Sequence, residues 1–418
     1  MSGNEGRAHA GARVLSRVPV APGSEGVRRL LPHLRSALDG TGPAIAPVPA
    51  VSATISQEYV ASVLDAVRAD DPAHPLESDD IALVMATSGS TGNPKGVLLT
   101  AQSLEPGTSA ANAGAPGPQW VAALPVTSMG GMNVVVRALA AGREPVTVES
   151  IGGAGPFTAD AFAAAVAEAA RHSSDIRTSL VPPQLARLLA SDAGIDALRG
   201  CSKILIGGAA TRGSLLDAAG ELGIDLTTTY GSTETAGGCV FDGRPIAGAS
   251  VEIIDDRIVL RGPMVARGYR CDPHETALRF RGSQADVFAT PDLGRLTEDG
   301  RLEVLGREDD VVMINAVNVS PDAIGHVIAD LPDVAAAAVV CVRPEHAEPR
   351  LVAFVEARES AEPGLIGERA RAAVLARLGR PAVPSLVVSV PALPHLPHGK
   401  VDRSRLEAWA RDELAGGR

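Results

Sequence analysis

The stretch IALVMATSGSTGNPKG, residues 81–96, joins an apolar run to a polar loop. Its first six residues are all apolar and follow the turn residues Asp79 and Asp80, which predicts a short buried strand. Glycines let a backbone approach an anion closely, hydroxyl groups donate to phosphate oxygens, and lysine supplies a compact positive charge. We therefore predict a phosphate-binding loop after this strand. Its expected binding residues are Thr87, Ser88, Gly89, Ser90, Thr91, Gly92 and Lys95.

The few lysines of the chain support this interpretation. Of the 38 basic residues only three are lysines, namely Lys95, Lys203 and Lys400. Arginine cannot replace lysine where a site needs a compact ammonium group. Lys95 lies in the loop, and Lys400 lies in the glycine-containing segment PHGKV, residues 397–401. The loop is not a Walker motif, because Gly96 rather than serine or threonine follows Lys95.

Strand-like and helix-like runs alternate on both sides of the loop. Alternation of this kind predicts a layered α/β domain. The expected strands are 81–86, 121–124, 145–149, 202–206 and 226–229, and the expected helices are 27–38, 57–69, 159–171 and 215–222. Residues 1–25 are rich in glycine, alanine, arginine and serine, and we expect them to be frayed.

The pattern changes in the last third of the chain. Short strands with tight turns are expected at 251–254, 257–260 and 301–305, and after residue 310 the order becomes helix, strand, strand, helix, strand. We therefore predict an α/β protein with two domains. A large N-terminal layered α/β domain covers residues 1–310, and a small C-terminal α+β domain covers 311–418.

Composition excludes several classes of protein. Aromatic residues make up 3% of the chain and the net charge is −11, which argues against a nucleic-acid-binding protein. No run approaches the length of a membrane span, and the N-terminus lacks the apolar stretch of a signal peptide. Four scattered cysteines without a C-x-x-C pair indicate a reducing compartment. We expect a cytoplasmic protein without nucleic-acid or membrane partners; a homodimer stays an open alternative.

Together these motifs resemble the adenylate-forming (acyl-CoA synthetase, or AMP-binding) superfamily over residues 81–405. The resemblance implies that the large domain is an AMP-binding adenylation domain and that the small C-terminal domain is mobile and joined to it by a hinge. The segment YGSTE, residues 230–234, resembles the motif whose threonine contacts the α-phosphate of ATP and whose glutamate holds Mg²⁺. By this resemblance Thr233 and Glu234 are catalytic residues, and Glu234 is the Mg²⁺ ligand. Lys400 resembles the lysine that bridges the attacking carboxylate and the α-phosphate.

The same resemblance assigns the rest of the ATP site. Gly207, Gly208 and Ala209 resemble the loop beside adenine, Asp292 the aspartate that binds both ribose hydroxyls, and Arg307 the arginine just before the hinge. Tyr230, Gly231 and Ser232 complete the set from the YGSTE motif. Alternatives remain for single residues: Glu234 as a helix N-terminal carboxylate and Asp292 as a turn residue.

Within the superfamily, three stretches most resemble actinobacterial o-succinylbenzoate–CoA ligases of menaquinone synthesis. These stretches are 230–243, 178–189 and the pair Leu124-Pro125 with VVVRA at 134–138. The resemblance implies an acid–thiol ligase that uses ATP, Mg²⁺ and CoA to activate an aromatic or dicarboxylic acid as its acyl adenylate. Two alternatives are an adenylating enzyme that passes the acyl group to an amine or a carrier protein, and a degenerate nucleotide-binding protein without activity.

Two residues are candidates for binding the acid. Ser128 stands where the family usually has a histidine that lines the acyl site. Arg137 lies on an apolar segment, and its guanidinium suits a second carboxylate of a dicarboxylic acid. The alternative for Arg137 is a surface-facing residue on an amphipathic helix.

Two further departures from the family concern the hinge and the path of the thiol. Met313 stands at the hinge, and Asn315-Ala316 replace the Gly-Gly of relatives. Glycines let the thiol arm pass close to the backbone, so side chains there are expected to hinder CoA transfer before they hinder adenylation.

Overall fold

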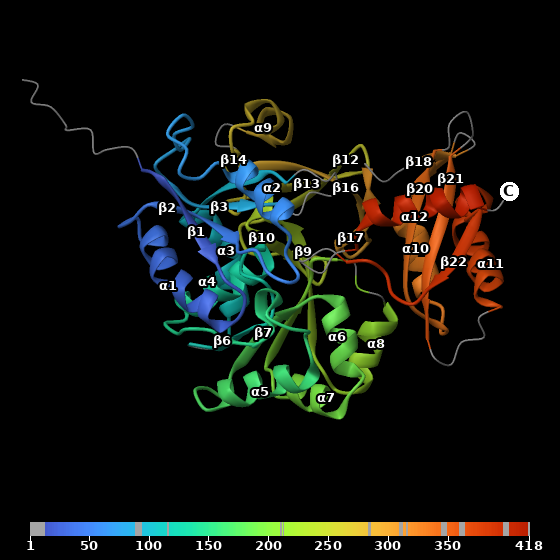
Figure 1. The fold of residues 1–418 in the computed structure, drawn as a ribbon, viewed down its shortest axis with the longest axis horizontal. Coiled ribbons are helices and arrows are strands. Elements are labelled where there is room, and N and C mark those ends of the chain that lie inside the picture. The colour runs from blue at the N-terminus through green and yellow to red at the C-terminus, as the bar shows by residue number, and fades with distance from the viewer. Residues whose placement is uncertain are drawn as a thin grey trace, which may run out of the picture. The chain divides into compact units, whose positions relative to one another are not determined.

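Figure 1 shows the fold of the chain in a computed structural model. The structure describes residues 13–87, 94–114, 117–209, 211, 213–282, 286–308, 312–314, 317–343, 349–358, 364–395 and 401–416. The chain divides into two compact units. The first unit comprises Met1–Thr178, Gly231–Cys239 and Gly262–Phe288, and the second comprises Ser179–Tyr230, Val240–Arg261 and Ala289–Arg418.

A five-stranded sheet forms one layer of the first unit. Its strand order is β1-β2-β3-β4-β14, with β1, β2 and β3 parallel and with β4 antiparallel to both β3 and β14. The strands are β1 (Leu15–Val20), β2 (Ala44–Pro49), β3 (Ile81–Ala86), β4 (Gly96–Thr100) and β14 (Gly268–Tyr269). The helices of this part are α1 (Ser24–Leu38), α2 (Gln57–Val67), α3 (Ala101–Asn112) and α9 (Pro273–Arg279).

Apolar patterning explains why these elements form. The strand predicted at 81–86 is β3, whose first five residues are buried as the continuous apolar run requires. Helix α1 buries Val27, Leu30, Leu31 and Leu34, which recur at helical spacing. Figure 1 shows α1 beside β1 and β2, where this apolar face packs.

The expectation that residues 1–25 are frayed is wrong for its described part. Residues Leu15–Val20 form β1, which pairs in register with β2 from Leu15↔Ala44 to Val20↔Pro49. Leu15, Val18 and Val20 are buried. Ser16, Arg17 and Pro19 separate the apolar residues of this segment. Composition therefore did not indicate the strand, which is stabilised by its pairing with β2.

A seven-stranded sheet has the order β11-β10-β9-β8-β7-β5-β6, and the division into two units passes through β7, β9 and β10. Its strands are β5 (Gln119–Ala122), β6 (Val146–Thr147), β7 (Ile176–Leu180), β8 (Lys203–Ile206), β9 (Leu226–Ser232), β10 (Gly237–Phe241) and β11 (Arg244–Pro245). Helices α4 (Met129–Ala140) and α5 (Ala159–Ala170) belong to the first unit. Helices α6 (Pro182–Leu189), α7 (Asp192–Arg199) and α8 (Gly213–Glu221) belong to the second.

Antiparallel strands follow, as the tight turns predict. Strands β12 (Ser250–Ile254) and β13 (Arg257–Arg261) form a hairpin around Asp255 and Asp256, both of which have positive φ. Strand β16 (Val287–Leu296) pairs with β15 (Phe280–Arg281) and with β17 (Leu302–Arg307). Short strands β18 (Val312–Ile314) and β19 (Val317–Val319) pair with each other.

The last part of the second unit is a three-stranded sheet covered by helices on both faces. Its strands are β20 (Val334–Val342), β21 (Arg350–Ala357) and β22 (Leu386–Val390), and its helices are α10 (Pro321–Ala329), α11 (Ile366–Leu378) and α12 (Arg403–Gly416). Along β21, Leu351, Ala353 and Val355 belong to one buried cluster and Val352 and Phe354 to another. This alternation of faces is the period of two that a strand imposes.

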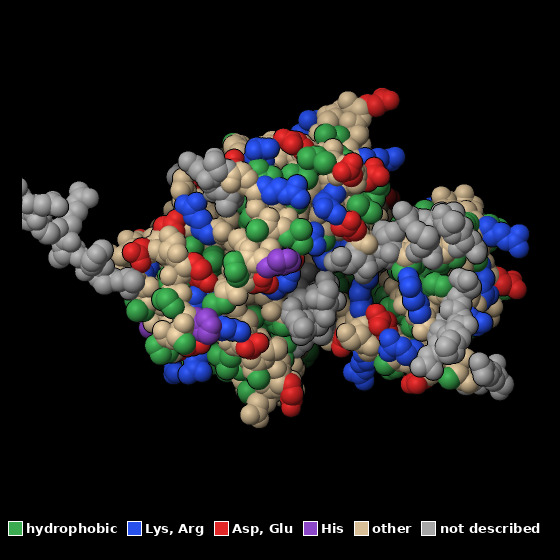
Figure 2. All heavy atoms as spheres, turned by 90° about the horizontal axis from the view of Figure 1, so that it is seen from above, with side chains coloured by type: hydrophobic (Ala, Val, Ile, Leu, Met, Phe, Trp, Pro, Cys, Tyr) green, Lys and Arg blue, Asp and Glu red, His purple; other side chains and the backbone are tan. Residues whose placement is uncertain are grey.

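The observed elements confirm the predicted α/β class. The predicted order of helix, strand, strand, helix and strand is found as α10, β20, β21, α11 and β22, whereas β18, β19 and α12 were not predicted. The division into residues 1–310 and 311–418 stays a prediction. No helix in the described ranges is both long enough and apolar enough to span a membrane. On the face that Figure 2 shows, acidic and basic side chains are intermixed.

Candidate active site

The predicted phosphate loop starts and ends on two strands that hold its ends together. Ala86 at the end of β3 and Gly96 at the start of β4 are cross-strand partners. The Thr87 N–H donates to the Lys95 carbonyl oxygen at 2.8 Å, and the Lys95 N–H donates to Thr87 Oγ1 at 2.9 Å. The loop is therefore closed at its base. The predicted binding residues Ser88, Gly89, Ser90, Thr91 and Gly92 lie outside the described residues.

Gly96 has a packing role that the loop interpretation did not include. A Cβ atom at this position would lie 2.5 Å from the Ala66 carbonyl oxygen and 2.9 Å from Arg270 Cβ. Side chains larger than glycine therefore do not fit where β4 passes α2 and β14. This glycine fixes the place of the strand from which Lys95 projects.

Lys95 is held by a carboxylate and an aromatic ring. Its Nζ lies 2.8 Å from Glu275 Oε1 and 4.8 Å from the centroid of the Tyr269 ring. Arg279 Nε lies 3.3 Å from the same Glu275 oxygen. The hydrogen bond from Lys95 lowers the pKa of Glu275, so this carboxyl group is charged at neutral pH. The ammonium therefore has a fixed counter-ion on α9 and a π face on β14.

The Tyr269 side chain also reaches Glu234. Glu234 lies in the single-turn helix η2 (Thr233–Thr235), and its Oε1 accepts a hydrogen bond from the Tyr269 hydroxyl at 2.9 Å. Burial and the negative charge of Glu234 raise the pKa of the Tyr269 phenol, so the hydroxyl keeps its proton and donates. We call Lys95, Glu234, Tyr269 and Glu275 the Tyr269 cluster.

The turn that carries Thr233 and Glu234 is fixed by its backbone and by α4. A Cβ atom on Gly231 would lie 2.0 Å from the Gly237 carbonyl oxygen, so the glycine of the YGSTE motif permits a close backbone approach. Asn133 Nδ2 on α4 donates to the Ala236 carbonyl oxygen at 2.9 Å. The Ala266 N–H donates to the Glu234 carbonyl oxygen at 2.8 Å. Ser232 belongs to the same turn, where its N–H donates to Thr235 Oγ1 at 2.9 Å.

A second group of predicted residues meets in the second unit. Asp292 on β16 and Arg307 on β17 are direct cross-strand partners, although fifteen positions separate them in the sequence. The Tyr230 hydroxyl donates to Asp292 Oδ2 at 2.7 Å, and Arg307 Nη1 lies 3.7 Å from Asp292 Oδ1. We call Tyr230, Asp292 and Arg307 the Asp292 cluster. Its carboxylate is oriented by side chains from two other strands, which a turn aspartate alone would not require.

The predicted adenine loop follows β8. A Cβ atom on Gly207 would lie 2.3 Å from Thr229 Oγ1, which itself donates to the Ile206 carbonyl oxygen at 3.2 Å. Gly208 has a φ of +79°, a conformation that favours glycine, and both Gly208 and Ala209 are exposed. Gly207 directly follows β8, and Tyr230 lies in the second half of the neighbouring parallel strand β9.

Ser128, a predicted acid-binding residue, is the N-cap of α4. Its Oγ donates to the Pro125 carbonyl oxygen at 2.7 Å and accepts from the Gly131 N–H at 3.4 Å. This capping role explains the serine structurally. A role for Ser128 in binding the acid stays a prediction.

Arg137, the other predicted acid-binding residue, is buried, so the alternative of a surface-facing arginine is wrong. Its side chain lies inside the first unit with its guanidinium carbon 5.3 Å from the Trp120 ring centroid, and the residue is 4% exposed. Burial lowers the pKa of Arg137 to about 10, which still leaves it charged at neutral pH. The Trp120 Nε1 donates to Asn112, and Asn112 Nδ2 donates to the Arg137 carbonyl oxygen.

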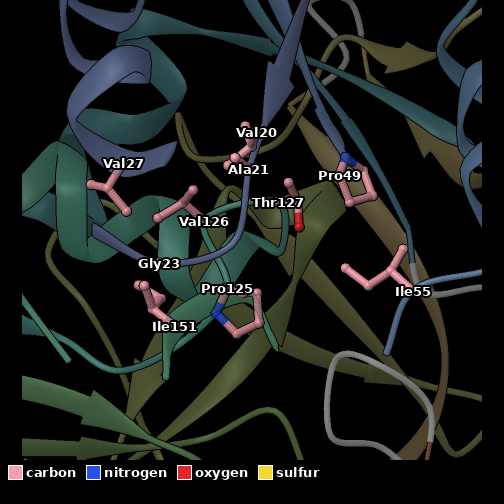
Figure 3. Close-up of a pocket in the computed structure, with 11 residues that line it drawn as sticks. Val20, Ala21, Gly23, Val27, Pro49, Ile55, Pro125, Val126, Thr127 and Ile151 are labelled. Carbon is pink, nitrogen blue, oxygen red and sulfur yellow. The ribbon is translucent and has the colours of Figure 1, made fainter. Parts of the chain in front are cut away.

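A small apolar cavity lies near the start of α4 in the first unit. It has a volume of about 20 Å³, and Figure 3 shows that Thr127 brings the one hydroxyl among the labelled side chains. Pro125, Val126 and Ile151 contribute part of its apolar wall. A cavity of this volume has room for about one water molecule, so it is not an acid-binding pocket as it stands.

Some predicted residues cannot be placed. Lys400 and the pair Asn315-Ala316 lie outside the described residues. Met313 lies in β18, but its side chain is not described. Within the described part of the chain, no three or more histidine, cysteine, aspartate or glutamate side chains gather as a metal site.

Sequence reasoning missed Tyr269 and Glu275. The chain has only three tyrosines, and two of them, Tyr230 and Tyr269, donate to a predicted site carboxylate. Asp272-Pro273 followed by Glu275 is also a helix-start pattern, and Asp272 Oδ1 accepts from the Glu275 N–H at 2.9 Å. The scarcity of tyrosine and this helix start were the signals available.

Two family models match the chain. The model described as AMP-binding enzyme matches residues 21–270, and the model described as AMP-binding enzyme C-terminal domain matches residues 323–400. A protein of Mycobacterium tuberculosis named probable 2-succinylbenzoate–CoA ligase is 34% identical over 92% of this chain and 96% of its own length. The 2-succinylbenzoate–CoA ligase of Geobacillus kaustophilus is 31% identical over 68% of this chain and 61% of its own length.

Solved structures share the fold. The amide bond synthetase McbA from Marinactinospora thermotolerans superposes with a TM-score of 0.75 at 24% identity, covering 95% of this chain and 90% of that one. The o-succinylbenzoate–CoA synthetase of Bacillus subtilis, in complex with an acyl-adenylate intermediate, gives a TM-score of 0.68 at 20% identity, with 96% and 89% covered.

These matches confirm the predicted superfamily and fold class, and the predicted AMP-forming acid–thiol ligase that uses ATP, Mg²⁺ and CoA agrees with them. The chain belongs to the AMP-binding enzyme family.

Proposed function

We propose that this chain activates o-succinylbenzoate with ATP and transfers the acyl group to CoA. The single observation that carries the proposal is the similarity to the mycobacterial ligase, which extends over nearly the whole of both chains. Support also comes from the two clusters, because each joins predicted ATP-site residues that are far apart in the sequence.

The proposed reaction has two steps. First, a carboxylate oxygen of the acid attacks the α-phosphorus of ATP, the bond from that phosphorus to the bridging oxygen breaks, and pyrophosphate leaves with the electron pair. Second, the sulfur of CoA attacks the acyl carbon, the bond to the AMP oxygen breaks, and the thiol proton is released. The first step brings like charges together, so cations and donors around the α-phosphate lower its barrier.

In this proposal the Tyr269 cluster serves the phosphates. Lys95 offers its ammonium to the departing pyrophosphate, together with the loop 87–95, and Thr233 donates to the α-phosphate. Lys400 bridges the attacking carboxylate and the same phosphate. Lys95 is held at the closed base of the loop, which supports its share of the role.

Glu234 fits the requirements of a Mg²⁺ ligand. Magnesium prefers oxygen ligands and is held by one or two carboxylates together with substrate phosphates and water. A carboxylate that accepts the Tyr269 hydroxyl at Oε1 still has a second oxygen for a metal. When bound, Mg²⁺ neutralises charge on the phosphate oxygens.

The Asp292 cluster serves the nucleoside. A carboxylate accepts hydrogen bonds from both ribose hydroxyls, and Tyr230 and Arg307 keep that of Asp292 in one orientation. The loop Gly207, Gly208 and Ala209 then lies beside the adenine. Gly208 is exposed and leaves the backbone there without a side chain, which supports close approach of a flat base.

Arg137 binds the second carboxylate of the acid in this proposal. A buried guanidinium is a strong partner for a carboxylate, because the pair forms two parallel charge-assisted hydrogen bonds. This role distinguishes a dicarboxylic acid such as o-succinylbenzoate from a monocarboxylic one. It also requires a path from the solvent to Arg137 when the acid binds. A cytoplasmic location, a possible homodimer and the lack of a nucleic-acid partner remain sequence predictions.

The test is a pyrophosphate-release assay over a panel of aromatic and aliphatic acids, with and without CoA, followed by mass analysis of the products. We expect pyrophosphate with o-succinylbenzoate and a thioester when CoA is present. The alternative enzyme, which passes the acyl group to an amine or a carrier protein, predicts an adenylate that CoA does not consume. Absence of pyrophosphate release with every acid would overturn the proposal and favour a nucleotide-binding protein without activity.

A further inference from the structure

We propose that Tyr269 is a positioning residue that orients the Mg²⁺ ligand Glu234 and at the same time supports Lys95. This inference rests on the proposed function and deepens it. It assigns one side chain to both charged groups that would meet the phosphate end of ATP. Tyr269 itself touches neither substrate nor metal in this account.

The first part of the argument is the hydrogen bond to Glu234. The Tyr269 hydroxyl donates to Oε1 of Glu234 at 2.9 Å, and this directional bond restricts the rotation of the carboxylate. The Glu234 backbone is fixed separately by the Ala266 N–H at 2.8 Å. With both ends of the residue tied, the oxygen that remains for a metal has a defined direction.

The second part is the contact with Lys95. The ammonium lies 4.8 Å from the centroid of the Tyr269 ring, within the range of a cation–π interaction. Glu275 Oε1 lies 2.8 Å from Nζ and forms an ion pair with the ammonium beside the ring. The aromatic face serves Lys95 and the hydroxyl serves Glu234, so the two contacts can be separated chemically.

The third part is the rigidity of Tyr269 itself. Its ring packs edge-on against Phe280, with ring centroids 5.2 Å apart and an interplanar angle of 78°. Its backbone N–H donates to Thr276 Oγ1 at 2.9 Å. Tyr269 is 6% exposed, so the ring has little freedom to move. A side chain fixed in this way can hold two other side chains in place.

Tyr269→Phe removes only the hydroxyl and keeps the ring under Lys95. We expect the half-saturating Mg²⁺ concentration in ATP–pyrophosphate exchange to rise about tenfold, since a hydrogen bond to a charged group is lost. Binding of ATP without Mg²⁺, measured by titration calorimetry, should stay within about twofold of the wild type, because Phe retains the aromatic face.

The matched control is Tyr59→Phe, which alters the one tyrosine outside both clusters, a residue on α2. It should leave the Mg²⁺ requirement and the binding of ATP unchanged. An unchanged Mg²⁺ requirement in Tyr269→Phe would overturn the proposal. Equal losses in the Mg²⁺ requirement and in Mg²⁺-free ATP binding would also overturn it, because they indicate general damage to the site.

The wild type separates failure of this inference from failure of the proposed function. If the wild type neither binds ATP nor exchanges pyrophosphate with any acid, the proposed function is wrong, and this inference is wrong with it. If the wild type does both and Tyr269→Phe has the same Mg²⁺ requirement as the wild type, only this inference is wrong.

Discussion

The Tyr269 cluster and the Asp292 cluster hold their carboxylates in different ways. In the Tyr269 cluster, Lys95 and Glu234 come from segments well apart in the sequence and are joined by a third residue between them. In the Asp292 cluster, the carboxylate and Arg307 are partners in one antiparallel strand pair. The first arrangement depends on tertiary packing. In the second, the pairing of Asp292 with Arg307 follows from strand register, and only the Tyr230 contact depends on tertiary packing.

The difference has a consequence for the effect of mutations. Strand pairing keeps Asp292 and Arg307 opposite each other whatever the neighbouring side chains are. The Tyr269 cluster loses its arrangement when the shared ring or hydroxyl is changed. We therefore expect the geometry of the Tyr269 cluster to depend more strongly on single side chains than that of the Asp292–Arg307 pair.

The largest effect is expected for Lys400→Ala. This substitution tests whether a residue outside both clusters supplies the positive charge between the attacking carboxylate and the α-phosphate. Adenylation should fall about a hundredfold or more, because a cation aimed at the transition state is lost. Thioester formation from synthetic acyl adenylate and CoA should be nearly unchanged. Single-turnover measurement of each half-reaction checks this, and equal losses in both would contradict the role given to Lys400.

For Arg137→Leu we expect a change of about tenfold or more in the KM for the acid. This substitution tests whether the acid binds at a site separate from both clusters. The KM for o-succinylbenzoate should rise, because a charge-assisted pair with the second carboxylate is lost. The KM for ATP should stay nearly the same.

The control for Arg137→Leu is a monocarboxylic aromatic acid tested with both proteins. Its KM should not respond to the substitution. A wild-type enzyme that prefers the monocarboxylic acid would remove the basis of the assignment. Thermal unfolding of the variant separates loss of a binding group from loss of packing against Trp120.

The smallest effect is expected for Asn315→Gly combined with Ala316→Gly, which tests the thiol path and leaves both clusters intact. Thioester formation should rise a few-fold, because glycine leaves room that a side chain occupies. Adenylation should not change. Rapid thioester formation by the wild type, with no gain in the double variant, would show that these departures from the family are neutral.

Much of the fold could be predicted from the sequence because its signals are local. The apolar run 81–86 became β3, and the helix predicted at 321–330 became α10, with Ser320 as its N-cap and Pro321 at its first position. Strand β1 was not predicted, because Ser16, Arg17 and Pro19 interrupt its apolar residues and leave no continuous apolar run. Its stability comes from β2 rather than from its own composition.

The residues of the candidate site also divide into those marked by local sequence signals and those brought together by tertiary structure. Motif residues such as Glu234 and Asp292 were identifiable because they lie in segments that resemble the motifs of a family and follow the same order along the chain. Tyr269 and Glu275 lie outside those segments, and only tertiary structure brings them to Lys95. The burial of Arg137 could not be predicted from the sequence either, because an arginine among valines on a helix can lie on the buried or on the exposed face.

The central claim is that the two clusters have separate tasks, one for the phosphates and one for the nucleoside. The direct test measures binding of AMP and of pyrophosphate separately to Asp292→Ala, to Lys95→Ala and to the wild type by titration calorimetry. Asp292→Ala should weaken AMP binding about 10- to 100-fold, since hydrogen bonds to a charged group are lost, and should leave pyrophosphate binding unchanged. Lys95→Ala should weaken pyrophosphate binding by about tenfold and leave AMP binding unchanged. Equal weakening of both ligands by both variants would contradict the separation.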